Sequence, residues 1–148
     1  MTTRHPEPHI DRVIALFEQL APADLARWES YYTEGARFKD PFNEVAGIEP
    51  MRRIFSHMFD ALGDPRFVIR QAIGGGPDCV LTWDFHFTLR ARAMRIHGAS
   101  HLHFAPDGRI DLHRDYWDAA EELYEKLPLL GGLMRAIRRR LRATDPPR

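Results

Sequence analysis

Cysteine, net charge and long apolar segments are all scarce in this chain of 148 residues. The single cysteine, Cys79, cannot form an internal disulfide, so nothing points to an oxidising compartment, and we expect it to be a small buried residue. Lysine and arginine number 21, as do aspartate and glutamate, which leaves no overall charge to attract nucleic acid or an acidic substrate. No apolar run is long enough to cross a bilayer.

The first residues also lack the features of an export signal. Residues 1–8 are polar and contain His, Glu and Pro instead of a basic start and an apolar stretch. We therefore expect a flexible N-terminus over 1–8 and a cytoplasmic location. The length fits one domain, which we place at 9–118, followed by a helical extension over 119–148.

Hydrophobic periodicity divides the domain into a helical first part and a second part rich in strands. Apolar residues recur at helical spacing at first, and from residue 67 onward they alternate, which is typical of half-buried strands. The predicted helices are 9–20, 22–34 and 50–62, and the predicted strands are 36–39, 67–73, 79–91, 94–104 and 109–117. This order predicts an α+β domain with helices on one face of an antiparallel sheet.

Two turns stand out between the predicted strands. The segment 74–78 begins with three glycines, but it does not indicate a phosphate-binding loop, because no Lys-Ser or Lys-Thr follows and a strand comes next. The segment 105–108, Ala-Pro-Asp-Gly, predicts a hairpin.

The chain resembles the nuclear transport factor 2-like superfamily in three features: three helices, a short strand ending in Asp40-Pro41, and a hairpin closing at residues 107–110. Within it the chain is most similar to SnoaL-like and ketosteroid-isomerase-like members, over residues 10–117, with 113–118 as the closing strand. The resemblance implies a cone-shaped, cystatin-like fold in which N-terminal helices pack on a curved antiparallel sheet and enclose an apolar pocket. The superfamily includes isomerases, polyketide cyclases, hydrolases, dehydratases and binding proteins, so the fold alone does not decide the function.

The resemblance implies a catalytic carboxylate at Asp40. Its aromatic neighbours Phe38 and Phe42 would exclude water, which suits a base. Steroid isomerisation also needs a tyrosine and a protonated aspartic acid as oxyanion donors, but their positions correspond to Leu16 and Ser100. Losing one such donor costs about a hundredfold or more in rate, so we do not expect this activity. A turn residue before proline explains Asp40 equally well.

The last predicted strand supplies the other candidate catalytic residues. The register implied by the resemblance points Asp111, His113, Asp115 and Trp117 toward the pocket. There, His113 or Asp115 would assist Asp40 by positioning a water or moving a proton. One β-bulge would instead exchange the faces of this strand and send these side chains to solvent or to an interface.

Alternate residues of the strand predicted over 79–91 form an aromatic face that should meet the helices. Such a face suits an apolar ligand, and it suits an ordinary core as well. Together with residues of the helices and the neighbouring strand, the predicted pocket lining is Leu16, Trp28, Phe38, Phe42, Phe55, Met58, Trp83, Phe85, Phe87, Ser100 and Trp117.

Three histidines and an aspartate are predicted on the opposite face of the sheet. His101 and His103 lie two residues apart, and His86 and Asp84 belong to the neighbouring strand. Four such groups could bind a metal, but this face lies away from the pocket and no tighter ligand motif is present. We interpret them as surface or interface histidines of a homodimer formed through the sheet, and we expect no metal.

The extension over 119–148 contains a basic amphipathic helix. Apolar residues recur at positions 130, 133, 134, 137 and 141, and five arginines crowd into 135–142. Such a helix packs on its own domain or on a second copy, or it makes peripheral contact with an anionic membrane through 129–142. Nucleic acid binding is not expected, because one charged helix face without aromatic residues is weak evidence for it.

Two functions from different classes remain open. One is a SnoaL-like enzyme of isomerase, cyclase or hydrolase type that acts by cofactor-free acid–base chemistry on a hydrophobic carbonyl or polycyclic compound. The other is a non-catalytic binding protein for an apolar small molecule or lipid. The position of Asp40 favours the enzyme slightly, and neither function requires a cofactor.

Overall fold

A computed structural model describes residues 4–122 and 128–141. The chain divides into two compact units, Met1–Trp117 and Asp118–Arg148. The first unit contains the sheet and the candidate site, and the second contains the helices α3 (Ala119–Glu122) and α4 (Pro128–Leu141). No helix in the described ranges is long and apolar enough to cross a membrane.

Helices and strands follow one another in the predicted order, with one strand added. The first unit consists of α1 (Pro8–Glu18), the 3-10 helix η1 (Pro22–Ser30), β1 (Tyr32–Lys39), β2 (Glu44–Ala46), α2 (Ile48–Ala61), β3 (Gly63–Gly75), β4 (Asp78–Leu89), β5 (Arg92–Phe104) and β6 (Ile110–Tyr116). The added strand, β2, pairs with β1 through only three residues, which is too short for a period-two pattern to reveal.

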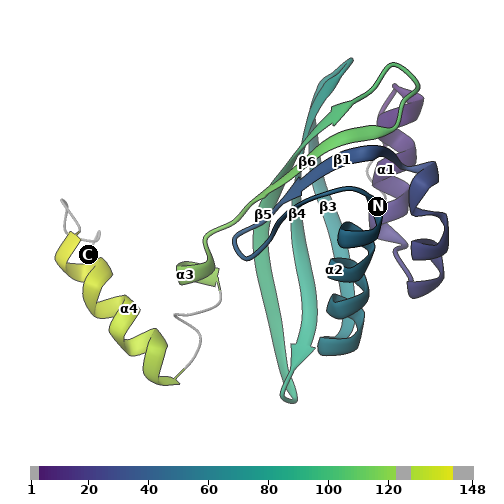
Figure 1. The fold of residues 1–148 in the computed structure, drawn as a ribbon. Coiled ribbons are helices and arrows are strands. Elements are labelled where there is room, and N and C mark those ends of the chain that lie inside the picture. The colour runs from purple at the N-terminus through teal and green to yellow at the C-terminus, as the bar shows by residue number, and fades with distance from the viewer. Residues whose placement is uncertain (1–3, 123–127, 142–148) are drawn as a thin grey trace. The chain divides into compact units, whose positions relative to one another are not determined.

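The six strands form one sheet in the order β2-β1-β6-β5-β4-β3. Neighbouring strands are antiparallel except β1 and β6, which run parallel. Figure 1 shows the sheet curving, with α1 and α2 against one face. Inward side chains alternate along β4 and β5, as the sequence pattern predicts. The buried ones include Leu81, Trp83, Phe85, Phe87, Met94, Ile96, Ser100, Leu102 and Phe104.

Tyr32 lies at the start of β1, although its spacing predicted a helix. The preceding η1 is a 3-10 helix with non-helical backbone angles at Arg27 (φ −114°, ψ 22°), and it ends at Ser30. Tyr32 then pairs with Ile110 of β6 and is fully buried. Pairing across the sheet and burial of the ring decide its structure, because local helix propensity is weak against tertiary packing.

A β-bulge at the start of β6 turns one predicted inward side chain outward. The register shifts between His103 and Phe104, which leaves Asp111 as the extra residue. The Asp111 carboxylate lies beside His103, with Oδ1 2.6 Å from Nδ1. The prediction that Asp111 faces the pocket is therefore wrong. His113 and Asp115 lie beyond the bulge and keep the inward direction.

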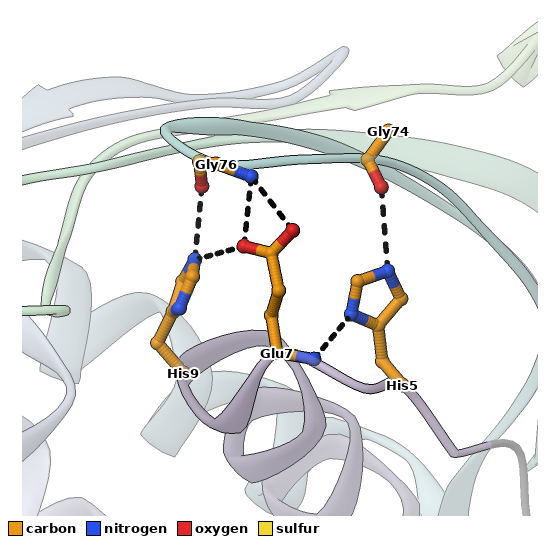
Figure 2. A network of polar contacts seen from close by, with 5 residues as sticks. All are labelled: His5, Glu7, His9, Gly74 and Gly76. Carbon is orange, nitrogen blue, oxygen red and sulfur yellow. Dashed lines mark hydrogen bonds and ion pairs between the residues drawn. The ribbon is translucent and has the colours of Figure 1, made fainter.

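Residues just ahead of α1 and in its first turn hold the turn between β3 and β4, as Figure 2 shows. Both carboxylate oxygens of Glu7 accept the N–H of Gly76, at 3.0 and 2.8 Å. His9 Nε2 donates to the Gly76 carbonyl at 2.9 Å, and His5 Nε2 donates to the Gly74 carbonyl at 3.3 Å. Gly74 and Gly76 have φ angles of +98° and +64°, which glycine adopts without strain. His5 and Glu7 belong to the segment expected to be flexible, and these bonds attach it to the sheet.

Histidines on the outer face of the sheet pair with separate aspartates. His101 bonds to Asp78 at 2.8 Å, and His103 bonds to Asp111. The hydrogen bond that His103 donates to the Asp111 carboxylate raises the pKa of His103. The groups considered above as metal ligands do not converge, and the described residues contain no group of three or more potential ligands placed to hold a metal ion.

Asp84 is the buried member of the outer face. Its side chain is only 8% exposed, yet it accepts hydrogen bonds from Arg70 Nε and Nη2 at 2.8 and 2.6 Å and from His97 Nδ1 at 2.7 Å. Burial opposes ionisation of this carboxyl, but the bonds to His97 and Arg70 outweigh burial and lower its pKa. Its ionised form therefore stabilises the fold above the unfolded-state pKa of about 4, and this contribution is lost as the pH falls through the lower folded value.

We predict that Asp84→Asn lowers the free energy of unfolding by about 2 kcal/mol at pH 7. The loss should shrink at about pH 3, because the Asp84 carboxyl of the unfolded wild type is then mostly protonated and the ionised form contributes less to stability. Asp78→Asn is the matched control, since Asp78 also pairs with a β5 histidine but its side chain is 56% exposed, and it should cost about 0–1 kcal/mol. Urea denaturation at both pH values measures the difference, and equal losses for the two variants would contradict the prediction.

Candidate active site

A small apolar cavity lies between the helices and the inner face of the sheet. It is lined by Phe17, Phe55, Phe67, Ile69, Leu81, Trp83, Ser100, His113 and Asp115. The space open to the centre of a water-sized sphere is about 10 Å³, which is room for roughly one water molecule. Polar groups on this wall come only from β4, β5 and β6.

His113 is a buried imidazole on the cavity wall, with 2% of its surface exposed. The rings of Phe17 and Phe38 meet it edge-on, with centroids 5.6 and 4.9 Å away. Its Nδ1 lies 2.8 Å from the Tyr32 hydroxyl, and its Nε2 lies 2.7 Å from Asp115 Oδ1. Because both ring nitrogens are paired, the imidazole is accommodated among apolar side chains.

Tyr32 determines the direction of these hydrogen bonds. Burial, followed by the negative charge of Asp115, raises the pKa of Tyr32 well above its usual value, so the phenol keeps its proton. A protonated phenol needs an acceptor, and His113 Nδ1 is the hydrogen-bond partner that the described residues give the Tyr32 hydroxyl. With the hydroxyl donating to Nδ1, the ring proton lies on Nε2. His113 in turn donates that N–H to Asp115.

A second chain of hydrogen bonds reaches the same carboxylate oxygen. Trp83 Nε1 donates to Ser100 Oγ at 2.8 Å, and Ser100 Oγ donates to Asp115 Oδ1 at 2.5 Å. Asp115 Oδ1 therefore accepts two hydrogen bonds, whereas Oδ2 accepts none from the described residues. Since the Asp115 side chain is 16% exposed and lines the cavity, Oδ2 is the acceptor that the site leaves for a ligand or a water.

Gly98 allows Trp83 to reach Ser100. A Cβ at position 98 would lie 2.5 Å from Cη2 of Trp83 and 3.0 Å from Cβ of Trp117. The indole therefore packs directly over the β5 backbone, a close approach that glycine within a strand often marks.

The Asp40 carboxylate binds its own turn and does not join the other predicted catalytic residues in the cavity lining. Asp40 Oδ1 accepts the backbone N–H groups of Phe42 and Asn43, at 2.8 and 2.6 Å. These bonds hold the turn between β1 and β2, and Asp40 is not among the cavity-lining residues. His113 and Asp115 do line the cavity, together with three residues of the predicted pocket, Phe55, Trp83 and Ser100.

The remaining residues of the predicted pocket lie outside the cavity lining. Phe42 is 56% exposed, and its ring meets that of Trp117 with centroids 5.5 Å apart. Met58 and Trp117 are half-buried. The buried ones belong to the surrounding core: Leu16, Trp28, Phe38, Phe85 and Phe87.

Five residues of the site were not predicted from the sequence: Tyr32, Phe17, Phe67, Ile69 and Leu81. Four of these lie on apolar stripes that the periodicity already showed, so a signal for them existed. Tyr32 lies on the apolar stripe of the helix predicted over 22–34, but that spacing does not indicate its contact with His113, which spans 81 positions along the chain.

The sequence profile of the SnoaL-like domain matches residues 13–113, more than half of the chain. The chain belongs to the SnoaL-like domain family. The matched region includes Tyr32, Trp83, Ser100 and His113, and it ends just before Asp115. This family is of a small-molecule-binding or cyclase type. No curated protein sequence matches this SnoaL-like chain.

Solved structures with a similar fold confirm the architecture of this SnoaL-like protein. An NTF2-like protein of unknown function from Burkholderia pseudomallei K96243 has a TM-score of 0.68 at 17% identity, covering 78% of this chain and 94% of that one. A protein with a ketosteroid isomerase-like fold from Catenulispora acidiphila DSM 44928, in complex with trimethylamine, gives 0.67 at 14%, covering 82% and 92%. An LEH-like epoxide hydrolase from M. tuberculosis gives 0.66 at 18%, covering 88% and 96%. At these identities the similarity establishes the fold alone.

We predict that Gly98→Ala destabilises the protein by about 1–3 kcal/mol, because the added methyl group forces the Trp83 indole to move. The movement should also break the Trp83–Ser100 hydrogen bond and change the tryptophan fluorescence of the folded state. Gly35→Ala in β1 is the control, since a Cβ there would meet nothing within 4 Å, and it should change stability by about 0.5 kcal/mol or less. Denaturation followed by fluorescence tests both variants, and a fluorescence spectrum of Gly98→Ala identical to wild type would argue against the packing described.

Proposed function

We propose that this SnoaL-like protein is an enzyme that acts by cofactor-free acid–base chemistry on a hydrophobic carbonyl compound, with Asp115 as the base. The observation that carries the proposal is the convergence of two hydrogen-bond chains on one oxygen of Asp115. Two donors on Oδ1 orient the carboxylate and keep Oδ2 available to accept a proton. The surrounding aromatic rings exclude bulk water, which strengthens electrostatic interactions at the site.

The two series of hydrogen bonds that meet at Asp115 assign different roles to the polar residues. A proton from a carbon next to the substrate carbonyl, or from a bound water, passes to Asp115 Oδ2 and is returned later in the reaction. His113 and Ser100 act through Asp115 and are positioning residues. His113 is not the base in this arrangement, because its Nδ1 accepts from Tyr32 and its Nε2 carries the proton given to Asp115.

The size of the cavity favours small substrates over polycyclic ones. Space for about one water molecule admits a substrate only when aromatic side chains move aside. Phe67 is the half-buried aromatic residue of the lining, so its movement opens the cavity with the least loss of packing. The same carboxylate could instead take a proton from a bound water, which makes the reaction a hydrolysis. One structural neighbour is an epoxide hydrolase.

A binding protein for apolar small molecules is the second candidate function. It is favoured by the lining itself, in which six of the nine residues are phenylalanine, isoleucine, leucine or tryptophan with no charge. A binding protein would not need the oriented carboxylate, so removal of Asp115 separates the two functions.

We predict that Asp115→Asn lowers kcat about 10²- to 10⁴-fold with little change in KM, because the amide cannot accept the proton. Asp40→Asn is the matched control, and it should lower stability through loss of the turn bonds while leaving kcat nearly unchanged. Incubating a panel of small hydrophobic ketones in D₂O, with NMR detection of deuterium next to the carbonyl, measures proton abstraction without knowledge of the product.

The outcomes separate the two functions. If the Asp115→Asn variant still incorporates deuterium, Asp115 is not the base. If the Asp40→Asn variant no longer incorporates deuterium, Asp40 is the base. If no ketone exchanges but several bind saturably to wild type and Asp115→Asn alike, the protein binds apolar compounds without transforming them.

A further inference from the structure

α4 presents apolar and basic side chains to solvent together. Leu133 is 58% exposed and Ile137 is 44% exposed, and their spacing of four residues places them on one side of the helix. Arg135, Arg139 and Arg140 are also exposed. A single exposed leucine is ordinary on a protein surface, but a pair on one helix side beside several arginines is typical of helices that lie at an interface.

The charge of this segment is of one sign. Residues 128–142 contain five arginines and no aspartate or glutamate. The whole chain contains equal numbers of basic and acidic residues, so the remainder of the chain has five more acidic than basic residues. The positive charge of this segment therefore favours an anionic partner. The remainder of the chain, which carries net negative charge, does not share this attraction.

We propose that α4 binds the surface of membranes that contain anionic phospholipid. In this arrangement the arginines pair with headgroup phosphates, and Leu133 and Ile137 enter the boundary of the acyl chains. The helix has 14 residues, about 21 Å of length, whereas the hydrocarbon core is about 30 Å thick. The helix therefore lies on the membrane and does not span it.

Two other partners use only half of these features. A nucleic acid would pair with the arginines and leave Leu133 and Ile137 in water. A second copy of α4 would cover the two apolar side chains and bring arginines of like charge together. An anionic lipid surface satisfies both sets of side chains at once.

Co-sedimentation of the full chain with vesicles tests the proposal. We expect binding to vesicles of phosphatidylglycerol and phosphatidylcholine, no binding to phosphatidylcholine alone, and loss of binding in high salt. Arg139→Glu with Arg140→Glu should weaken binding about 25-fold or more. Leu133→Gln with Ile137→Gln, which keeps helix propensity, should weaken it about tenfold or more.

A matched control removes the same charge elsewhere. Arg53→Glu with Arg66→Glu replaces two exposed arginines of α2 and β3 and should leave vesicle binding within about twofold of wild type. Equal weakening by this control would overturn the assignment to α4. Binding of an RNA oligonucleotide as tight as vesicle binding, unaffected by the Leu133 and Ile137 changes, would also overturn the proposal. Absence of vesicle binding would overturn the proposal as well. If the protein instead forms a dimer that the Leu133 and Ile137 substitutions dissociate, α4 binds a second copy of the chain.

Discussion

A carboxylate that faces an apolar cavity needs hydrogen-bond donors to replace water, and the strand order of the sheet supplies them to Asp115. Tyr32 lies on β1, His113 on β6, Ser100 on β5 and Trp83 on β4, and these four strands are neighbours in that order. The two hydrogen-bond chains therefore cross the sheet from both sides and meet at Asp115. The rest of the site follows from this crossing, since each link requires the inward side chain of one strand to meet that of the next.

Features outside the cavity lining maintain this alignment. The bonds of Glu7 and His9 to Gly76 attach the start of α1 to the β3–β4 turn, and α1 carries Phe17 to the cavity. Gly98 lets the Trp83 indole lie on β5. This SnoaL-like domain thus combines an apolar cavity wall with one carboxylate oriented by hydrogen bonds. That combination supports acid–base chemistry, and the fold by itself does not specify the substrate.

The outcome at individual residues shows which sequence signals are dependable. Alternation along β4 placed Trp83 inward, because the side-chain direction of a strand repeats every two residues. Alternation along β5, in the register that the family resemblance implies, placed Ser100 inward as well. The same rule gave the wrong face for Asp111, because a bulge inserts one residue that no composition signal marks. Asp40 shows a third case, since a carboxylate before proline suits a base and a turn equally well. Its bonds to Phe42 and Asn43 are those of a turn residue.

The sequence by itself determined the α+β class and the order of helices and strands, because these depend on periodicity and on short segments of chain. The tertiary structure alone decided that Tyr32 joins β1 and donates to His113, that both chains end on one oxygen of Asp115, and that the cavity holds about one water molecule. These properties arise from contacts between residues as many as 81 positions apart. Their geometry depends on the register and twist of the whole sheet, which local patterns do not encode.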